Sequence, residues 1–266
     1  MIIVGEKLNS TLKAVRPAME KRDAQKIIDL AQRQYDAGAT YIDLNAAMFG
    51  DAEVEIMEWL VNTVQDALPA PLAFDSPNPE AIKRAFMVNK NPKPMINSIT
   101  AEKERFDGLA PILCEYESSV VALCMDDSGM PETIDGRLKI ADKLIEDLLK
   151  LGVKLEDIYI DPMVRPIGTG PHYGIVALET IRGVKQKFPE AHIMCGLSNI
   201  SFGMPARKLI NQVFLVSAMT AGLDGAILDP LDKKLMSLLY AAEAVLGIDE
   251  YGINYLEKFR EGEIEA

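Results

Sequence analysis

Long apolar runs are absent from this 266-residue chain. A helix that crosses a bilayer needs roughly 20 consecutive apolar residues, and no stretch here approaches that length. The opening residues, MIIVGEKLNS, also lack the charged start and the apolar stretch of a secretory signal. We therefore expect a cytoplasmic protein without a membrane partner, whose first residues form a strand.

Cysteine and histidine are scarce. The cysteines, Cys114, Cys124 and Cys195, are odd in number and far apart, which is typical of free thiols in a reducing cytoplasm. The histidines, His172 and His192, do not stand in ligand spacing with each other or with a cysteine. No tightly bound metal is therefore expected. We expect His192 to begin a strand, at the end of the sheet remote from chemistry.

Basic residues are outnumbered. The chain has 28 Lys and Arg against 40 Asp and Glu, which gives a formal net charge of −12. This charge repels nucleic acid and anionic membranes and favours a partner with a basic face. Apolar residues make up 48% and charged residues 26% of the chain, so the composition is that of an ordinary soluble globular protein.

Eight short apolar runs recur along the chain and predict strands. They lie at 2–5, 40–44, 71–75, 94–97, 119–125, 157–161, 192–198 and 224–229. Near-continuous apolar runs are typical of parallel strands that are buried on both faces.

Segments with helical periodicity separate these runs. Asp23 is placed to cap one of the helices, and Gly38 and Gly152 stand where helices should end before the next strand. Eight alternations without a linker favour the α/β class and a closed (β/α)8 TIM barrel over an open doubly wound sheet. We expect residues 1–266 to form a single domain, with 247–266 as a C-terminal extension.

Polar residues follow the apolar runs. In such barrels chemistry takes place at the carboxyl ends of the strands, where all these residues would meet. They are Glu6, Asn9, Asp43, Asn45, Asp75, Asn97, Asp126, Asp161, Asn199 and Asp229. Any one of them could instead cap the next helix. We expect Asp229 to be only a cap, and Asp126 and Asp127 to be turn residues.

The set of carboxylates and amides favours one kind of ligand. It suits a neutral heterocycle rich in N–H donors rather than a sugar phosphate. The last strand is followed by DPLDK, without the glycines of a barrel phosphate site. There is no G-x-S-x-G elbow, and G-T-G at 168–170 reads as a loop. A Schiff base on Lys7 remains a minor alternative.

Six motifs together resemble the methyltetrahydrofolate:corrinoid protein methyltransferases, which are pterin-binding enzymes. The motifs are VGEKLN at 4–9, DLN at 43–45, FDS at 74–76, MINS at 95–98, IDP at 160–162 and GLSN at 196–199. The similarity covers residues 1 to about 246 in order. Each motif is weak alone, and the set is specific.

The resemblance implies a pterin held at the barrel mouth by Asp75, Asn97 and Asp161. Further positions that match the family and would bind or support the substrate are Glu6, Asn9, Asp43, Asn45, Gly196, Ser198 and Asn199. Arg207 matches a residue near the folate tail, or is simply a solvated helix start. The positions expected to take part in catalysis are Asp75, Asp161 and Asn199.

The implied reaction moves a methyl group between N5 of tetrahydrofolate and the cobalt of a corrinoid carried by a partner protein. An amide cannot act as a general acid, but Asn199 can offer either N–H or C=O to N5 and so stabilise the transition state. A homodimer is also implied. The direction of transfer is left open by the sequence.

The chain departs from the family at Lys7, where arginine is common, and at Phe202, where some relatives have a polar residue. No role is therefore transferred to Phe202. Dihydropteroate synthase is one alternative, but its basic strand-seven motif is replaced here by Ser198, Asn199 and Ile200. A non-catalytic folate-binding module is another. The extension at 247–266 either covers the bottom of the barrel or helps to form a dimer.

Overall fold

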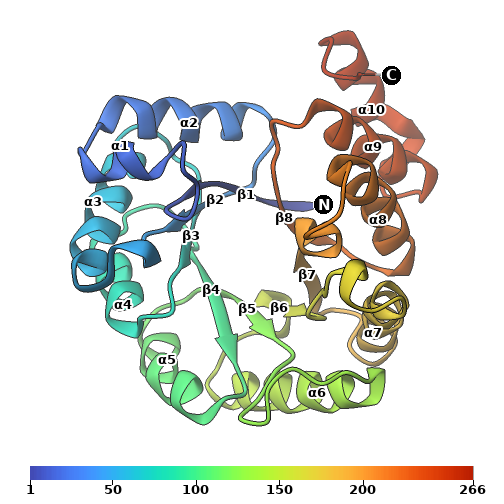
Figure 1. Cartoon of the computed structure of the whole chain (residues 1–266), viewed down its shortest axis with the longest axis horizontal. Helices are drawn as coiled ribbons and strands as arrows, with labels where there is room; N and C mark the ends of the chain where they lie inside the picture. Colours follow the sequence, from blue (N-terminus) through green and yellow to red (C-terminus); the bar gives the residue numbers. More distant parts are fainter. Residues whose placement is uncertain (266) are drawn as a thin grey trace.

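The computed structural model describes residues 1–265, and its eight parallel strands close into a barrel in sequence order (Figure 1). The strands are β1 (Ile2–Asn9), β2 (Tyr41–Asn45), β3 (Leu72–Asp75), β4 (Met95–Thr100), β5 (Ser119–Leu123), β6 (Ile158–Asp161), β7 (His192–Gly196) and β8 (Gly225–Leu228). Because β8 pairs with β1, the expected (β/α)8 barrel is confirmed and an open sheet is excluded.

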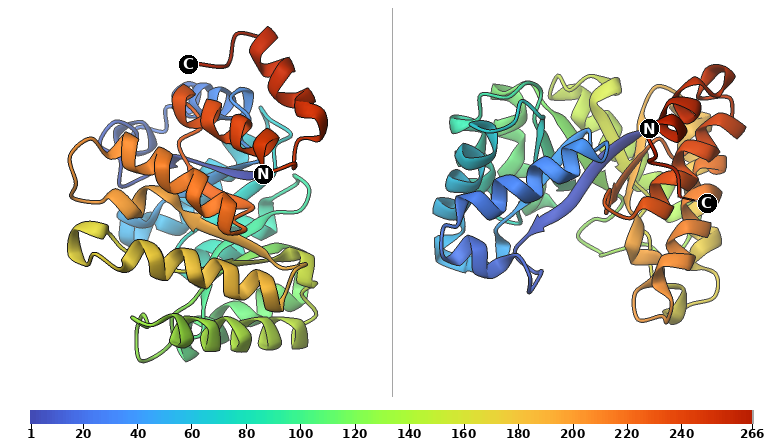
Figure 2. Two further views of the ribbon diagram at one scale, coloured as in Figure 1. Left: turned by 90° about the vertical axis from the view of Figure 1, so that its right-hand side faces the viewer. Right: turned by 90° about the horizontal axis from the view of Figure 1, so that it is seen from above.

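Helices form the outer layer around the strands, which Figure 2 shows from two further directions. The α-helices are α1 (Arg16–Glu20), α2 (Ala24–Asp36), α3 (Glu53–Gln65), α4 (Pro79–Val88), α5 (Lys103–Glu115), α6 (Ile134–Lys150), α7 (Tyr173–Lys187), α8 (Arg207–Ala221), α9 (Lys233–Val245) and α10 (Ile253–Arg260). Short 3-10 helices are η1 (Ala47–Ala52), η2 (Leu155–Asp157), η3 (Ile167–Thr169), η4 (Leu197–Ser201) and η5 (Glu250–Gly252).

A side-chain cap and two glycines with positive φ define the predicted helix boundaries. The Asp23 carboxylate accepts a hydrogen bond from the Lys26 N–H at 3.3 Å, which caps α2. Gly38 and Gly152 have φ of +97° and +90° just beyond α2 and α6, where a side chain would be strained. The expected sites of helix termination are therefore confirmed.

The predicted cap of the last barrel helix was wrong. Asp232, not Asp229, accepts the N–H of Leu235 at 3.3 Å and caps α9. Asp229 stands three residues too early, and its carboxylate instead accepts the N–H of Leu231 and pairs with Lys7. Asp229 is thereby left at the barrel mouth.

β1 is longer than its apolar run, which ends at Gly5. Its pairing with β2 is irregular between Gly5 and Leu8, where the buried side chain of Gln34 accepts the N–H of Lys7 at 2.9 Å. A Cβ on Gly5 would lie 2.7 Å from Oε1 of Gln34, so a larger residue there would displace the Gln34 amide from Lys7. The strand then continues with Glu6 directed to the mouth.

Two apolar layers hold the barrel together. One lies between strands and helices and includes Ile42, Leu72 and Ile96, each fully buried. The other fills the barrel interior with residues such as Met95 and Met194. Side chains alternate along a strand, so the two layers use alternate positions of the same strands.

The C-terminal extension packs on the outside of the barrel. Helix α10 contacts α9, and the chain then returns toward the mouth, where the Glu265 N–H donates to Ser237 Oγ at 2.8 Å. Of the two positions expected for the extension, covering the barrel bottom is thus not the arrangement found for residues 247–265. Among residues 1–265, no helix has the length and apolar character needed to cross a bilayer.

Candidate active site at the barrel mouth

A cavity of about 630 Å³ opens at the carboxyl ends of the strands. All of the predicted site residues except Asn45 line it: Glu6, Asn9, Asp43, Asp75, Asn97, Asp161, Gly196, Ser198, Asn199 and Arg207. The fold therefore brings together residues that lie far apart in the sequence.

Strand alternation explains why these polar groups converge. An apolar layer crosses the barrel interior at Val4, Tyr41, Ala73, Met95 and Tyr159. Two residues later on the same strands stand Glu6, Asp43, Asp75, Asn97 and Asp161, which line the cavity. Residues two apart face the same side of a strand, so the polar residues lie on the apolar layer and form the floor of the site.

Asn45 stands beside Asp75 on the neighbouring strand and does not line the cavity. Its amide Nδ2 donates to Oδ2 of Asp75 at 2.8 Å, and its Oδ1 accepts from Ser10 Oγ at 2.9 Å. The Ala47 N–H donates to the same Oδ1 at 3.1 Å. Asn45, expected to bind or support substrate, therefore takes the supporting position and orients Asp75.

Asp43 and Asn97 form a second pair in the floor. Nδ2 of Asn97 donates to Oδ1 of Asp43 at 3.0 Å, and both side chains are buried. Burial raises the pKa of Asp43 well above its usual value, and the nearby charges of Asp75 and Glu6 raise it further. The hydrogen bond from Asn97 opposes this shift without cancelling it.

The pKa of Asp75 is subject to opposing effects. Burial raises its pKa to about 6, while the hydrogen bond from Asn45 and the charge of Arg105 lower it. The Arg105 guanidinium is itself fixed by the carbonyl oxygens of Ser76 and Pro77, each at 2.7 Å, and by that of Ser98. Arg105 thus bridges the segments that follow β3 to the end of β4 by hydrogen bonds, and its positive charge lowers the pKa of Asp75.

After Asp43, Asp161 is the most buried acid of the floor. Burial raises its pKa to about 7, against hydrogen bonds from the N–H groups of Met163 and Gly196. The Met163 N–H donates to its Oδ1 at 2.7 Å. The buried Arg137 fixes this loop by donating to the carbonyls of Pro162 and Met163 at 2.7 and 2.9 Å.

Glu6 completes the acidic floor, and burial raises its pKa to about 7. Lys7 lowers this pKa, and Asp229 raises it. Lys7 Nζ lies 2.7 Å from Oδ2 of Asp229, and both residues line the cavity. Sequence reasoning set both aside, although the position of Asp229 two residues after the inward-facing Ile227 could have revealed it.

The loop after β7 brings Asn199 to the wall of the cavity. A Cβ on Gly196 would lie 2.9 Å from Nδ2 of Asn199, so the glycine leaves the space that this amide occupies. Asn199 is exposed, and its side chain makes no hydrogen bond with the described residues, 1–265. The amide is therefore available to a ligand.

Arg207 begins α8 at the rim. Its Nη2 donates to the Ser198 carbonyl at 2.7 Å and its Nε to Ser201 Oγ at 3.1 Å, so the side chain is fixed to the loop that contains Asn199. The guanidinium lies 5.8 Å from the ring centre of Phe202, which is 67% exposed. The cavity thus has an acidic floor and a basic rim.

Comparison with known proteins identifies the family. A family model described as pterin-binding enzyme matches residues 5–229. The chain belongs to the pterin-binding enzymes. It is 38% identical over 266 residues to the methylcorrinoid:tetrahydrofolate methyltransferase of Eubacterium limosum, and the match covers 99% of this chain and 98% of that protein.

Two further proteins are similar to this chain. The methionine synthase of Mycobacterium tuberculosis is 33% identical over 240 residues, which are 85% of this chain but 20% of that longer protein. The Xanthomonas albilineans dihydropteroate synthase has a TM-score of 0.65 at 14% identity, and the match covers 94% of this chain and 93% of that one. The second likeness shows the fold alone.

The floor of the site is rich in carboxylates. Within residues 1–265, no group of three or more His, Cys, Asp or Glu side chains is arranged to hold a metal ion. Buried carboxylates without a full set of donors lose free energy unless a ligand supplies N–H groups or protons. The floor of the site therefore favours a ligand with several N–H donors.

Proposed function

We propose that this pterin-binding enzyme transfers a methyl group from the cobalt of a methylcorrinoid, carried by a partner protein, to N5 of tetrahydrofolate. One observation carries the proposal: the barrel mouth concentrates Glu6, Asp43, Asp75 and Asp161, with Asn97, around one cavity. The name of the Eubacterium limosum relative supports both the substrates and the direction.

The pterin is placed by its hydrogen-bonding edge. The N3–H and the 2-amino group of a pterin form two parallel donors, which match one carboxylate. We assign Asp75, Asn97 and Asp161 to this edge, with Asp43 behind Asn97 and Asn45 behind Asp75. Each charge-assisted bond contributes about 1.5 to 3 kcal/mol, so the match is strong enough to select a pterin.

In the proposed reaction, the lone pair of N5 attacks the methyl carbon and the cobalt–carbon bond breaks. Both electrons of that bond stay on cobalt, which is reduced from Co(III) to Co(I), and N5 then loses its proton. Positive charge develops on N5 as the new bond forms. The amide oxygen of Asn199 can accept the N5–H and stabilise that charge.

The corrinoid is a substrate on a second protein, so the site must be reachable by that protein. The cavity opens at the mouth, and Asn199 and Arg207 form part of its rim. Ser198, Gly196 and Asn9 complete the wall on the way to the rim. We propose that this rim receives the corrinoid domain.

The state of the protein in the cell is also a proposal. A single domain over 1–266, a homodimer and a cytoplasmic location fit the family. The three free cysteines suit a reducing compartment. Large apolar side chains are exposed on the C-terminal segment, among them Ile248, Tyr251 and Phe259, and they support a homodimer.

Dihydropteroate synthase activity is less well supported. The likeness in fold extends to that enzyme, but the η4 stretch Ser198, Asn199 and Ile200 lacks a basic pair for pyrophosphate. A non-catalytic folate binder shares every feature of the floor. An experiment therefore has to observe the cobalt centre.

The test mixes the protein with a methylated corrinoid protein and tetrahydrofolate under anaerobic conditions. The methyl-Co(III) absorption should decay, and Co(I) absorption should appear at a rate proportional to enzyme concentration. If the methyl-Co(III) absorption decays at a rate independent of enzyme concentration while tetrahydrofolate still binds, the protein is a non-catalytic folate binder. Absence of tetrahydrofolate binding would refute the assignment of the pocket.

A further inference from the structure

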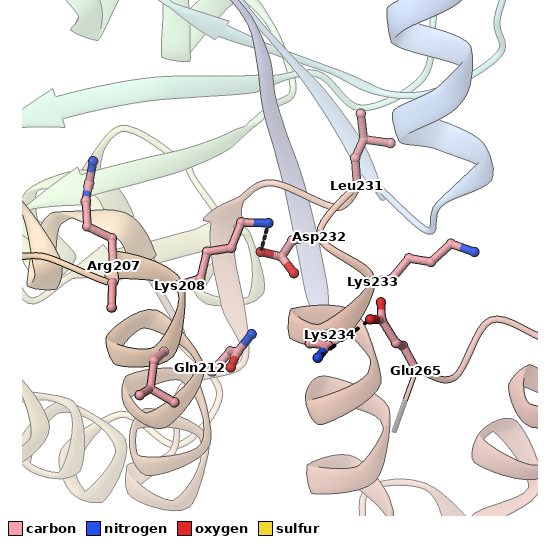
Figure 3. A pocket seen from close by; sticks show the side chains of 10 residues that line it. Arg207, Lys208, Gln212, Leu231, Asp232, Lys233, Lys234 and Glu265 are labelled. Atoms are coloured by element: carbon pink, nitrogen blue, oxygen red, sulfur yellow. Dashed lines mark ion pairs between the residues drawn. The ribbon is translucent and has the colours of Figure 1, made fainter.

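A second cavity, of about 660 Å³, lies beside the candidate active site, between the first turns of α8 and α9 (Figure 3). We call it the basic groove; it is lined by residues 206–209, Gln212, residues 231–234 and Glu265. Figure 3 shows that its charged side chains come from the first turns of both helices and from the returning C-terminal segment.

The basic groove adjoins the pterin cavity. Arg207, Lys208 and Asp232 line both cavities. A ligand held by the acidic floor would therefore enter the basic groove by passing Arg207 and the Lys208–Asp232 ion pair.

The charge of the basic groove is opposite to that of the whole chain. Four cations and two carboxylates line the groove, in a chain with a net charge of −12. Lys208 Nζ pairs with Asp232 at 3.0 Å and Lys234 Nζ with Glu265 at 3.7 Å. Among residues 1–265, neither Arg207 nor Lys233 forms an ion pair with a carboxylate. Two cations are thus left for an anionic ligand.

The position of these cations has an electrostatic cost. The N-terminal end of a helix carries a partial positive charge, which favours acids and disfavours bases. Helices α3, α4, α5 and α6 follow this rule and have an acid in the first turn. Helices α8 and α9 begin with Arg207-Lys208 and Lys233-Lys234 and, like α2 and α7, have none, although the N-cap Asp232 offsets part of the cost at α9. A bound polyanion would offset the repulsion.

We propose that the basic groove binds the γ-linked glutamate tail of the folate, so that this enzyme prefers polyglutamylated substrate. The inference rests on the proposed function, because it takes the pterin as the anchored end. Lys234 already contacts one carboxylate, that of Glu265. The Glu265 side chain stands where a tail carboxylate would pair, and it competes with the tail for this lysine.

The test compares the dissociation constants of tetrahydrofolate with one and with three glutamates, measured by anaerobic calorimetry. Two added exposed ion pairs, at about 0.2 to 1 kcal/mol each, correspond to between about twofold and thirtyfold. We expect the triglutamate to bind at least about threefold more tightly at low salt. This preference should shrink as salt screens the charges.

Matched variants isolate the basic groove. Lys233→Ala/Lys234→Ala should bring the ratio of the two dissociation constants toward one, and both lysines are exposed, so the fold should persist. Lys83→Ala, at an exposed lysine of α4 that lines neither cavity, should retain the wild-type ratio. Glu265→Gln should increase the preference for the triglutamate.

Equal affinities for the two substrates would overturn the inference, as would a preference that survives in the double variant. A double variant that slows turnover with the corrinoid protein but keeps the triglutamate preference would assign the groove to protein docking instead. Failure of the monoglutamate itself to bind would refute the proposed function. Binding of the monoglutamate with a ratio of one would refute only the role of the groove.

Discussion

Replacing Asp75 by asparagine should stabilise the protein at alkaline pH while removing its ability to bind a pterin. Burial raises the pKa of Asp75 from 3.8 to about 6. Its raised pKa means that the folded protein holds this proton more tightly than the unfolded chain does. The resulting stabilisation is complete below about pH 4 and is lost as the pH rises through about 6.

The magnitude follows from the pKa. A rise from 3.8 to about 6 corresponds to about 3 kcal/mol against the charged form. The side chain is only half-buried at the cavity, so solvent screening reduces the expected effect to about 1 to 2 kcal/mol. Loss of this charge also relieves Asp43, whose pKa is raised by Asp75. The amide oxygen of the variant can still accept the hydrogen bond from Asn45.

The assay is urea unfolding of wild type and Asp75→Asn at pH 5 and pH 8. The variant should gain about 0.5 to 1 kcal/mol of unfolding free energy relative to wild type between these two pH values, because wild type has already lost about half of the stabilisation linked to Asp75 at pH 5. Asp51→Asn, at an exposed aspartate outside the cavity, controls for the loss of one acidic residue. An equal difference between Asp75→Asn and wild type at both pH values would refute the claim that the floor stores unfavourable charge.

Three further predictions concern the catalytic wall and its support. Asn199→Ala should lower kcat by about 100- to 1000-fold with little change in KM, because it removes a preorganised dipole at N5, and activity within about twofold of wild type would exclude that role. Gly196→Ala should lower kcat by about tenfold or more at an unchanged melting temperature, since the added Cβ would stand 2.9 Å from Nδ2 of Asn199 and displace the amide; full activity would show that the amide position does not matter. Asn45→Ala should shift the acidic limb of the pH–rate profile upward, because the Asn45 hydrogen bond lowers the pKa of Asp75, and an unshifted limb would mean that Asp75 need not be ionised.

The fold was accessible from the sequence because parallel strands buried on both faces leave continuous apolar runs. The runs missed the end of β1, where Glu6, Lys7 and Asn9 are polar because they line the mouth. They also overextended β5, which ends at Leu123 although apolar residues continue to 125. An apolar run reports burial, whereas a strand requires a hydrogen-bonded neighbour.

The floor of the candidate site was accessible for a related reason. Polar residues at strand ends converge in any barrel, so Glu6, Asp43 and Asp161 could be placed together before their distances were known. The sequence could not predict which of these polar residues line the cavity and which only support a neighbouring side chain. Whether Asn45 faces the ligand or Asp75 depends on the rotamer that its contacts with Ser10 and Asp75 select.

The basic groove had no sequence signal of its own. Lys208, Lys233 and Glu265 come from separate segments of the chain, and the net charge of −12 gives no sign of a local basic cluster. They meet only because α8 and α9 are adjacent and the C-terminal segment returns along α9. A cluster that depends on helix packing requires the tertiary structure.

The most direct test of the proposed reaction follows the methyl carbon itself. A corrinoid protein methylated with carbon-13 is mixed with tetrahydrofolate and the enzyme, and the label is observed by NMR. We predict that the signal moves from methyl–cobalt to N5-methyl of the folate in step with enzyme concentration, and that Asn199→Ala slows this movement while tetrahydrofolate still binds. A label that stays on cobalt, with folate bound and the corrinoid protein intact, would contradict the proposed methyl transfer.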